Sequence, residues 1–263
     1  MSAPRLEIEA LTVRFGGLAA VDDVSFSVAP GTVHGLIGPN GAGKTTLFNL
    51  ISGLVAPSGG AIRLDGQRID DLPSWGRARS RLARTFQNIR MFQDMSALET
   101  VMTGMHTRLG EGLAASLLRM GGFRKAETGA VARAWELLAF VGLADAARRR
   151  SGDLPYGDQR RLEIARALAL EPRLLLLDEP AAGMNPSETL ALEDLLEKLK
   201  AQGLTILLVE HDMHFVMRLC DRITVLNFGR RIAQGAPHEV RADPRVVEAY
   251  LGARVARSLE APQ

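Results

Sequence analysis

The stretch from Gly38 to Thr46 constrains the fold of this chain more than any other. It reads Gly38, Pro39, Asn40, Gly41, Ala42, Gly43, Lys44, Thr45 and Thr46, and it fills every fixed position of the phosphate-binding template G-x-x-x-x-G-K-[S/T]. Glycines let the backbone approach an anion closely, and successive N–H groups then form a nest for phosphate oxygens. Lys44 adds a positive charge for the β- and γ-phosphates, and the Thr45 hydroxyl is suited to bind Mg²⁺.

The residues around this loop predict a strand before it and a helix after it. Residues 32–37 form a short apolar segment that is typical of a buried strand, and residues 45–52 favour a helix. A helix N-terminus attracts anions because its first N–H groups lack partners within the helix. A glycine-rich turn that matches by chance is the alternative. The flanking elements favour the binding loop, so we expect the chain to bind a nucleoside triphosphate.

Composition excludes several other classes of protein. The 263 residues have a formal net charge of only +2, which argues against a general nucleic-acid surface. The single cysteine, Cys220, excludes an internal disulfide framework and is typical of the cytosol. The N-terminal residues lack the apolar stretch of a signal peptide, and no apolar run approaches the ~20 residues that span a bilayer. We therefore expect any link to a membrane to depend on a partner protein.

The predicted elements indicate an α/β fold with additions. Residues 6–15 alternate apolar and polar as a half-buried strand does, and a second strand is predicted over residues 21–28. Asp65 and Gly66 between short apolar segments are a strong hairpin signal. Four leucines before Asp178 predict a strand buried on both faces, and another buried strand is predicted over residues 204–210. Residues 222–227 and 231–234 predict a closing hairpin.

Helices are predicted around and between these strands. From about residue 73 to residue 153 Ala, Leu, Arg and Glu dominate, and we expect helices over residues 97–106 and 131–141. Helical spacing in the second predicts that Trp135, Leu138 and Val141 share one face. Asn185 as N-cap, with proline next and a glutamate at the third helical position, predicts a further helix. Its apolar stripe is Leu192, Leu195, Leu196 and Leu199.

Five further positions are candidates for chemistry. Asp178 ends a buried strand, where a second Mg²⁺ contact is needed beside a phosphate loop, and Glu179 can polarise a water as a general base. His211 follows the next strand and can contact a γ-phosphate, although an ordinary exposed or capping histidine is the alternative. Gln87 can sense the metal or the water. Phe15 can stack on a base or belong to the core of the first strand.

A second possible anion site precedes a basic helix. It consists of Leu154, Pro155, Tyr156, Gly157, Asp158 and Gln159, which form a loop before that helix. A loop glycine next to a helix N-terminus can bind an anion. Since the chain has one phosphate loop, this second site indicates that the nucleotide of a partner binds there.

Taken together and in this order, these residues resemble the ATP-binding subunit of an ABC transporter from about Leu6 to Leu251. The matching parts are the aromatic A-loop at Phe15, Walker A at residues 38–45, the Q-loop glutamine Gln87, the signature loop at residues 154–158, Walker B at residues 174–178, the catalytic Glu179 and the switch His211. Residues 84–92, 157–169, 181–186, 210–213 and 247–252 are similar to the branched-chain amino acid importers in particular. The segment between Gly110 and Gly122 also fits that subgroup, and a helical core segment is the alternative.

The resemblance implies a fold, a set of site residues and a set of partners. The fold is an α/β P-loop NTPase (RecA-like) core of residues 1–87 and 159–252 with an N-terminal antiparallel β-subdomain. Residues 88–158 form an inserted helical subdomain with the signature loop, and residues 253–263 form a flexible tail. The cofactors are ATP and Mg²⁺. The catalytic residues are Glu179, His211, Gln87 and Lys44, the metal contacts are Thr45, Gln87 and Asp178, and the phosphate loop and Phe15 bind the nucleotide.

The implied partners are a second ATPase subunit, identical or similar, and two transmembrane permease subunits. A periplasmic or extracellular solute-binding protein takes part indirectly, and no nucleic acid is expected. The chain would lie at the cytoplasmic face of the inner membrane, held there by the permeases. Urea or amide importers, lipid or lipopolysaccharide exporters and soluble ABC ATPases are the alternative classes.

The signature departs from the family pattern L-S-G-G-Q at three positions. Pro155 replaces the serine, Tyr156 the first glycine and Asp158 the glutamine, whereas Gly157 is retained. Proline has neither the hydroxyl that would meet the γ-phosphate of the partner's ATP nor a backbone N–H. We therefore predict ATPase activity with weakened closure of the dimer.

Overall fold

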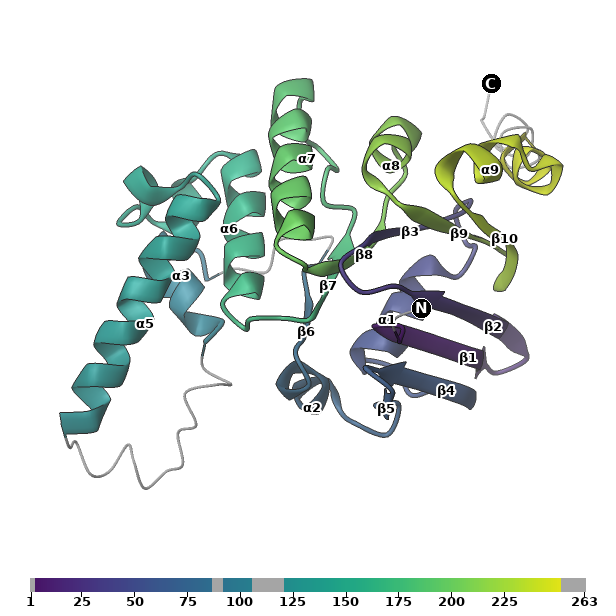
Figure 1. Ribbon diagram of the computed structural model, residues 1–263, viewed down its shortest axis with the longest axis horizontal. Helices are drawn as coiled ribbons and strands as arrows, with labels where there is room; N and C mark the ends of the chain where they lie inside the picture. Colours follow the sequence, from purple (N-terminus) through teal and green to yellow (C-terminus); the bar gives the residue numbers. More distant parts are fainter. Residues whose placement is uncertain (1–2, 87–91, 106–120, 252–263) are drawn as a thin grey trace.

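A computed structural model describes residues 3–86, 92–105 and 121–251 of the chain (Figure 1). Its central sheet contains β3 (Val33–Ile37), β6 (Leu82–Arg84), β7 (Leu174–Asp178), β8 (Thr205–Val209), β9 (Arg222–Asn227) and β10 (Arg230–Gly235). In the described part of the chain these strands lie in the order β10-β9-β3-β8-β7-β6. Neighbouring strands are parallel, except that β9 and β10 form an antiparallel hairpin. The carboxyl ends of β3, β7 and β8 therefore meet at one edge of the sheet.

Alternate residues of the central strands belong to two different hydrophobic clusters. In β7, Leu175 and Leu177 belong to a cluster with the helices α6 (Tyr156–Leu168), α7 (Pro186–Ala201) and α8 (Met213–Leu219). Leu174 and Leu176 belong to another cluster, with α1 (Lys44–Ser52) and the strands of a second, antiparallel sheet. None of these four leucines is exposed to solvent. Successive side chains of a strand point to opposite faces, so a strand covered on both faces needs an unbroken apolar run. The strand predicted before Asp178 is confirmed.

A second, antiparallel sheet lies beside the first. Its strands are β1 (Leu6–Phe15), β2 (Leu18–Val28), β4 (Gly59–Leu64) and β5 (Gln67–Arg68), in the order β2-β1-β4-β5. The turn between β4 and β5 has positive φ at both Asp65 (50°) and Gly66 (75°), as the hairpin signal predicts. Strands β1, β2 and β4 share one hydrophobic cluster with α1 (Lys44–Ser52), which begins directly after the phosphate loop. The predicted hairpin and the predicted β-subdomain are both present.

Helix α7 (Pro186–Ala201) has the N-terminus and the apolar stripe that its sequence predicts. The Asn185 side chain accepts a hydrogen bond from the Glu188 N–H at 3.0 Å, and the Glu188 carboxylate accepts from the Asn185 N–H at 2.9 Å. This is a complete capping box. The buried residues of α7 are Leu192, Leu195, Leu196 and Leu199. Together with α8 (Met213–Leu219), α7 contributes to the cluster on one face of the central sheet.

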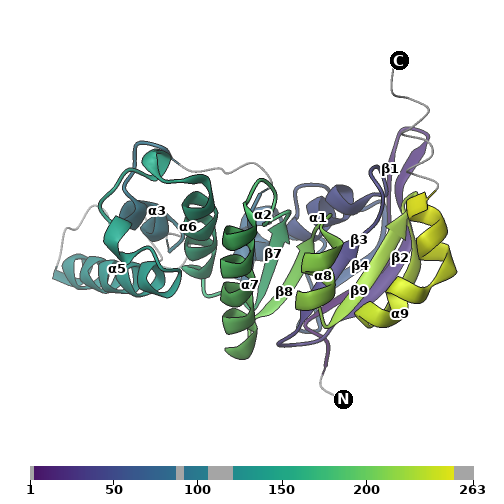
Figure 2. The same ribbon diagram turned by 90° about the horizontal axis from the view of Figure 1, so that it is seen from above.

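The remaining helices include a group at one end of the molecule and two short ones nearer the sheets. Figures 1 and 2 show α3 (Ala97–Thr103), α5 (Gly121–Phe140) and α6 (Tyr156–Leu168) grouped at the end away from β1, β2 and β4. The 3₁₀ turns η1 (Ala144–Ala146) and η2 (Ser151–Asp153) connect α5 to α6. Helix α2 (Ser74–Arg79) follows β5, and α9 (Pro237–Ala242) follows β10.

The predicted apolar face of α5 is partly wrong. Leu138 and Val141 are buried, but Trp135 is 37% exposed, and Ala134 and Leu137 face the core in its place. Residues 134, 137, 138 and 141 have helical spacing, so the predicted periodicity was right, and only the place of Trp135 on the buried face was wrong. A small alanine allows α5 to pack closely, whereas the large indole lies at the surface.

Some predictions fall outside the described residues. These are Gln87, the segment from Gly110 to residue 120, and the tail of residues 253–263. Within the described ranges, none of the helices combines the length and hydropathy needed to cross a membrane.

Candidate functional site

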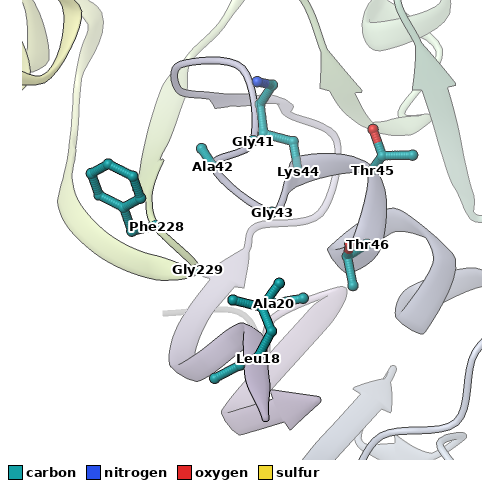
Figure 3. A pocket seen from close by; sticks show the side chains of 11 residues that line it. Leu18, Ala20, Gly41, Ala42, Gly43, Lys44, Thr45, Thr46, Phe228 and Gly229 are labelled. Carbon is teal, nitrogen blue, oxygen red and sulfur yellow. The ribbon is translucent and has the colours of Figure 1, made fainter. Parts of the chain in front are cut away.

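The phosphate loop connects β3 to α1 as its sequence predicts (Figure 3). Lys44 is the first residue of α1, and its ammonium donates to the carbonyl oxygens of Gly38 at 2.7 Å and Pro39 at 2.9 Å. Burial lowers the pKa of Lys44, and the nearby carboxylates of Glu179 and Asp178 oppose that shift. No side chain caps the N-terminus of α1. The loop therefore surrounds a cation and presents the first N–H groups of α1, which suits a phosphate group.

Two glycines of the loop are required by their surroundings. Gly38 has φ of 152°, and a Cβ there would lie 2.1 Å from the Leu226 carbonyl oxygen. Gly43 has φ of 98°, and a Cβ there would lie 2.5 Å from the Ala20 carbonyl oxygen. Both distances are far below contact, so no larger residue fits without moving the backbone of β2 or β9. The loop conformation thus depends on strands from both sheets.

A pocket of about 260 Å³ opens beside the loop (Figure 3). Its lining residues are Leu18, Ala19, Ala20, Gly41, Ala42, Gly43, Lys44, Thr45, Thr46, Phe228 and Gly229. Phe228 lies in the β9–β10 turn and is 84% exposed, and the next residue, Gly229, donates its N–H to the Ala42 carbonyl oxygen at 3.0 Å. Phe15 ends β1, is 53% exposed and does not line this pocket, so its stacking role stays a prediction. The sequence-based interpretation overlooked Phe228, whose only local signal is an aromatic residue in a hairpin turn.

The predicted carboxylates and histidine meet at the adjoining strand ends. Asp178 is the last residue of β7, and Glu179 follows it with φ of 48°, a strained conformation for a side chain of this size. The Glu179 N–H donates to the Val209 carbonyl oxygen at 2.9 Å, which holds the residue against β8. His211 Nε2 donates to Glu179 Oε1 at 2.5 Å. The structure therefore brings together a carboxylate and an imidazole that are 32 positions apart in the chain.

Glu210 connects the two loops that carry Glu179 and His211. It is 4% exposed, and its carboxylate accepts from the Ala181 N–H at 2.8 Å and the His211 N–H at 2.9 Å. Burial raises the pKa of Glu210, whereas these backbone hydrogen bonds lower it. A carboxylate that accepts from both loops fixes the loop after Glu179 relative to the loop that carries His211. The signal in the sequence was a buried strand that ends in a carboxylate next to a histidine.

Arg84 is a further residue that the sequence-based interpretation did not assign to the site. It ends β6, and its guanidinium donates to Asp178 Oδ2 at 2.9 Å. The side chains of Arg84 and Asp178 are 7% and 5% exposed. An arginine in a short strand that otherwise reads apolar was the available signal. The predicted metal contact Asp178 is therefore already fixed at one of its two oxygens.

The signature residues form the start of a helix more than a loop. Helix α6 begins at Tyr156, and Pro155 is its N-cap with φ of −53°, ψ of 152° and no side-chain cap hydrogen bond. Gly157 is buried, and a Cβ there would lie 2.8 Å from Glu188 Oε1 of α7. Tyr156 is 42% exposed, and its hydroxyl accepts from Arg160 Nη2 at 2.9 Å. The predicted helix N-terminus is thus present, one turn earlier than a loop through Asp158 would place it.

The signature helix is also joined to the strand that leads to Gln87. Arg160 Nη1 donates to the Phe86 carbonyl oxygen at 2.8 Å, and the Phe86 N–H donates to Glu163 Oε1 at 3.2 Å. Arg160 and Glu163 pair with each other at 3.3 Å and are almost fully buried. Burial raises the pKa of Glu163, and its hydrogen bonds and the neighbouring arginines lower it. Both backbone groups of Phe86 are therefore held by α6.

The donors near the loop fit a magnesium ion that is bound together with a nucleotide. The described residues contain no cluster of three or more His, Cys, Asp or Glu side chains that would hold a metal unaided. Magnesium usually takes only one or two protein oxygens and shares the remaining positions among waters and substrate phosphates. The Thr45 hydroxyl at the start of α1 and the Asp178 carboxylate are donors of this kind. The donor set therefore agrees with a metal that arrives with a triphosphate.

A phosphate loop between β3 and α1, with carboxylates at the end of β7 and directly after it and a histidine after β8, defines a P-loop ATPase. The chain matches the family described as ABC transporter over residues 21–182 and the family described as branched-chain amino acid ATP-binding cassette transporter over residues 230–256. The chain belongs to the ABC transporter family, as an ATP-binding cassette. The predicted fold class and the predicted family are confirmed.

Known relatives cover nearly the whole chain. It is 48% identical to the high-affinity branched-chain amino acid transport ATP-binding protein BraF of Pseudomonas aeruginosa, over 96% of this chain and 99% of that protein. It is 46% identical to the corresponding protein LivG of Escherichia coli K12, with the same coverage. The crystal structure of a nucleotide-free ATP-binding cassette from an ABC transporter superposes with a TM-score of 0.83, at 32% identity over 94% of this chain and 99% of that one.

Proposed function

We propose that this protein hydrolyses ATP as a subunit of an ABC importer and thereby powers the uptake of branched-chain amino acids. The contact of Glu179 with His211, beside the phosphate loop, supports the hydrolytic role most directly. The two relatives named above carry branched-chain amino acid transport in their names, and their similarity extends over nearly all of this chain. The substrate assignment therefore rests on family membership, and the catalytic assignment rests on the site.

In this mechanism the residues of the chain bind the nucleotide, orient the attacking water and accept its proton. Lys44 and the N–H groups at the start of α1 hold the β- and γ-phosphates, and the purine side of the nucleotide occupies the adjacent pocket. Thr45 and Asp178 would hold Mg²⁺, which would neutralise charge on the phosphates. Glu179 Oε2 polarises the attacking water while Oε1 receives the His211 N–H. We expect the His211 imidazole to contact the γ-phosphate when the nucleotide is bound.

The remaining site residues act between subunits. Two cassettes, identical or similar, would enclose two ATP molecules, each held between one phosphate loop and the opposite signature. In that arrangement Gly157 and the N-terminus of α6 face the partner's ATP, and Pro155 offers it no hydroxyl. Gln87 would respond to the metal and the water, and the hydrogen bonds that join α6 to Phe86 would connect this response to the signature helix.

We also propose partners and a location for this subunit. Two transmembrane permease subunits would bind between the Q-loop region and the helical part of the chain, and a solute-binding protein would deliver the amino acid to them. The ATPase would then lie peripherally at the cytoplasmic face of the inner membrane. Co-purification with permeases tests this assembly, and transport by the reconstituted complex tests the solute. Uptake of urea or amides in place of leucine, isoleucine and valine would indicate the neighbouring subgroup, and absence of any permease would indicate a soluble ATPase.

Glu179→Gln is the variant that tests the hydrolytic assignment. The amide keeps the size of the side chain but cannot accept a proton, so we expect ATP binding to remain and hydrolysis to fall by at least about 100-fold. The variant should also accumulate a closed dimer with ATP, visible by size-exclusion chromatography. Glu197→Gln, on the exposed side of α7, is the matched control and should hydrolyse ATP normally. Near-normal turnover of Glu179→Gln would remove the role that we assign to this residue.

A further inference from the structure

Arg84 is held between the end of β7 and the helix that follows the phosphate loop. One terminal nitrogen, Nη2, donates to Asp178 Oδ2 at 2.9 Å. The other, Nη1, donates to Asn49 Oδ1 at 2.8 Å and to Ser52 Oγ at 2.7 Å, and both of these residues belong to α1. A single planar guanidinium thus joins the proposed metal carboxylate to the helix that begins at Lys44.

The groups around this guanidinium leave it little freedom to reorient. The Ser52 hydroxyl donates to the Phe48 carbonyl oxygen at 2.8 Å, so its oxygen faces Arg84 as an acceptor. The aromatic rings of Phe48 and Phe86 lie 5.6 Å and 5.1 Å from the guanidinium carbon. A cation over an aromatic ring is attracted to the face of that ring, and low solvent exposure strengthens the attraction. The hydrogen bonds and the rings therefore fix the plane of the guanidinium.

The arrangement also fixes Asp178. The strand register places Arg84 opposite Leu176 of β7, and the Thr85 N–H donates to the Leu176 carbonyl oxygen at 3.0 Å. The backbone of Arg84 is therefore fixed in register with β7. A carboxylate with one oxygen held in this way has its other oxygen, Oδ1, directed by the same geometry. Thr45, the second proposed metal contact, lies in the first turn of α1, to which the arginine is anchored.

We infer that Arg84 is a positioning residue that holds Asp178 and α1 in register, so that Oδ1 of Asp178 and the hydroxyl of Thr45 bind the same metal ion. This inference rests on the proposed metal role of Asp178 and goes beyond it, because it assigns the geometry of the site to a residue that touches neither the metal nor the nucleotide. Partners that orient metal-binding carboxylates typically change metal affinity by about 10–100-fold when they are removed.

Whether replacement of Arg84 weakens or tightens metal binding distinguishes a positioning role from a purely electrostatic one. A cation close to a metal site repels the metal ion, so removal of a cation that acted only through its charge would tighten metal binding. Loss of a positioning contact lets the carboxylate rotate and weakens metal binding. Lysine preserves the charge but has no planar fork, so it can reach Asp178 or α1 but cannot bridge both.

The experiment measures the affinity of the ADP complex for Mn²⁺, with the free ion followed by electron paramagnetic resonance, on the full-length chain. We expect Arg84→Met to raise the Mn²⁺ Kd by about 10-fold or more and Arg84→Lys by at least about 3-fold. The Kd for ATP in the absence of metal should stay within about twofold of wild type, because neither variant alters the phosphate loop. If Arg84→Met does not fold, Arg84→Lys decides the question.

Arg77 provides a matched control. It is 1% exposed and also binds α1, but it donates to carbonyl oxygens, which include those of Ile51, Leu72 and Asp70, each at 2.9 Å. Arg77→Lys and Arg77→Met should therefore leave the Mn²⁺ Kd unchanged even if they lower the thermal stability. A loss of Mn²⁺ affinity that was equal in the Arg77 and Arg84 variants would indicate general loosening of α1 and would overturn the inference.

Two further outcomes would also overturn it. One is a Mn²⁺ Kd for Arg84→Lys within twofold of wild type, and the other is tighter Mn²⁺ binding by Arg84→Met. Asp178→Asn distinguishes this failure from failure of the proposed function. If Asp178→Asn weakens Mn²⁺ binding and the Arg84 variants do not, only the positioning role fails. If Asp178→Asn also has no effect, the proposed metal site itself is wrong, and the inference fails with it.

Discussion

The substitution Pro155→Ser tests whether the unusual signature limits closure of the ATPase dimer. Pro155 is the N-cap of α6, and no side chain caps that helix. A serine there accepts a hydrogen bond from an N–H of the first turn and stabilises the helix by about 1 kcal/mol. Replacing the proline also frees the unfolded chain, which destabilises the folded state by about 0.4–1 kcal/mol. These terms oppose each other, so the free energy of unfolding should change by less than about 0.6 kcal/mol.

The new hydroxyl has a second effect, which only the dimer reveals. Its oxygen accepts from the helix N–H, and its proton remains available for the γ-phosphate of the opposite nucleotide. A hydrogen bond to a charged group contributes about 1.5 kcal/mol at the lower end of the measured range, and 1.4 kcal/mol is tenfold in an equilibrium constant. A dimer of two variant chains gains this hydrogen bond at each of its two ATP sites, so we expect the ATP-dependent dimerisation constant to rise about 100-fold and turnover to rise with it, while thermal stability hardly changes.

Two assays follow these effects separately. Sedimentation velocity with MgATP in a Glu179→Gln background measures dimerisation without hydrolysis, and steady-state ATPase assays in the otherwise native chain measure turnover. Pro73→Ser is the matched control, because Pro73 is likewise an N-cap without a side-chain hydrogen bond, on α2. It should change neither quantity. If Pro155→Ser leaves both dimerisation and turnover unchanged, or if Pro73→Ser raises them equally, Pro155 does not limit closure of the dimer.

Two other predictions concern stability and the loop. Burial, with a smaller contribution from Arg222, lowers the pKa of His34 to about 3, whereas an unfolded histidine has a pKa of about 6.5. Below pH 6.5 the unfolded chain therefore binds a proton that the folded chain excludes, and stability should fall by up to about 1.4 kcal/mol per pH unit toward pH 5. Denaturant titrations of His34→Gln should show a shallower fall, and equal slopes would contradict this. Gly38→Ala should lower Tm and abolish nucleotide binding because its Cβ would lie 2.1 Å from the Leu226 carbonyl oxygen. Gly41→Ala, where the added Cβ meets open space, should lower Tm less, and an equal loss would argue against the steric explanation.

Much of the fold was predictable because its signals are local. The phosphate loop, the four leucines before Asp178 and the capping box at Asn185 each lie within a few residues, and each produced the element that it predicts. Local patterns succeed here because turn chemistry, helix capping and two-sided burial restrict the backbone through near neighbours. The resemblance of the ordered motifs was then enough to predict the family.

The sequence by itself thus determined the elements, their order, and the residue types that gather at the carboxyl ends of the strands. Only the tertiary structure decided which of these residues touch. It moved the buried face of α5 from Trp135 to Leu137, and it placed Phe228 beside the nucleotide pocket. It also paired Arg84 with Asp178 across 94 positions of the chain. Such contacts depend on strand order and side-chain packing between distant segments, so no spacing within the sequence encodes them.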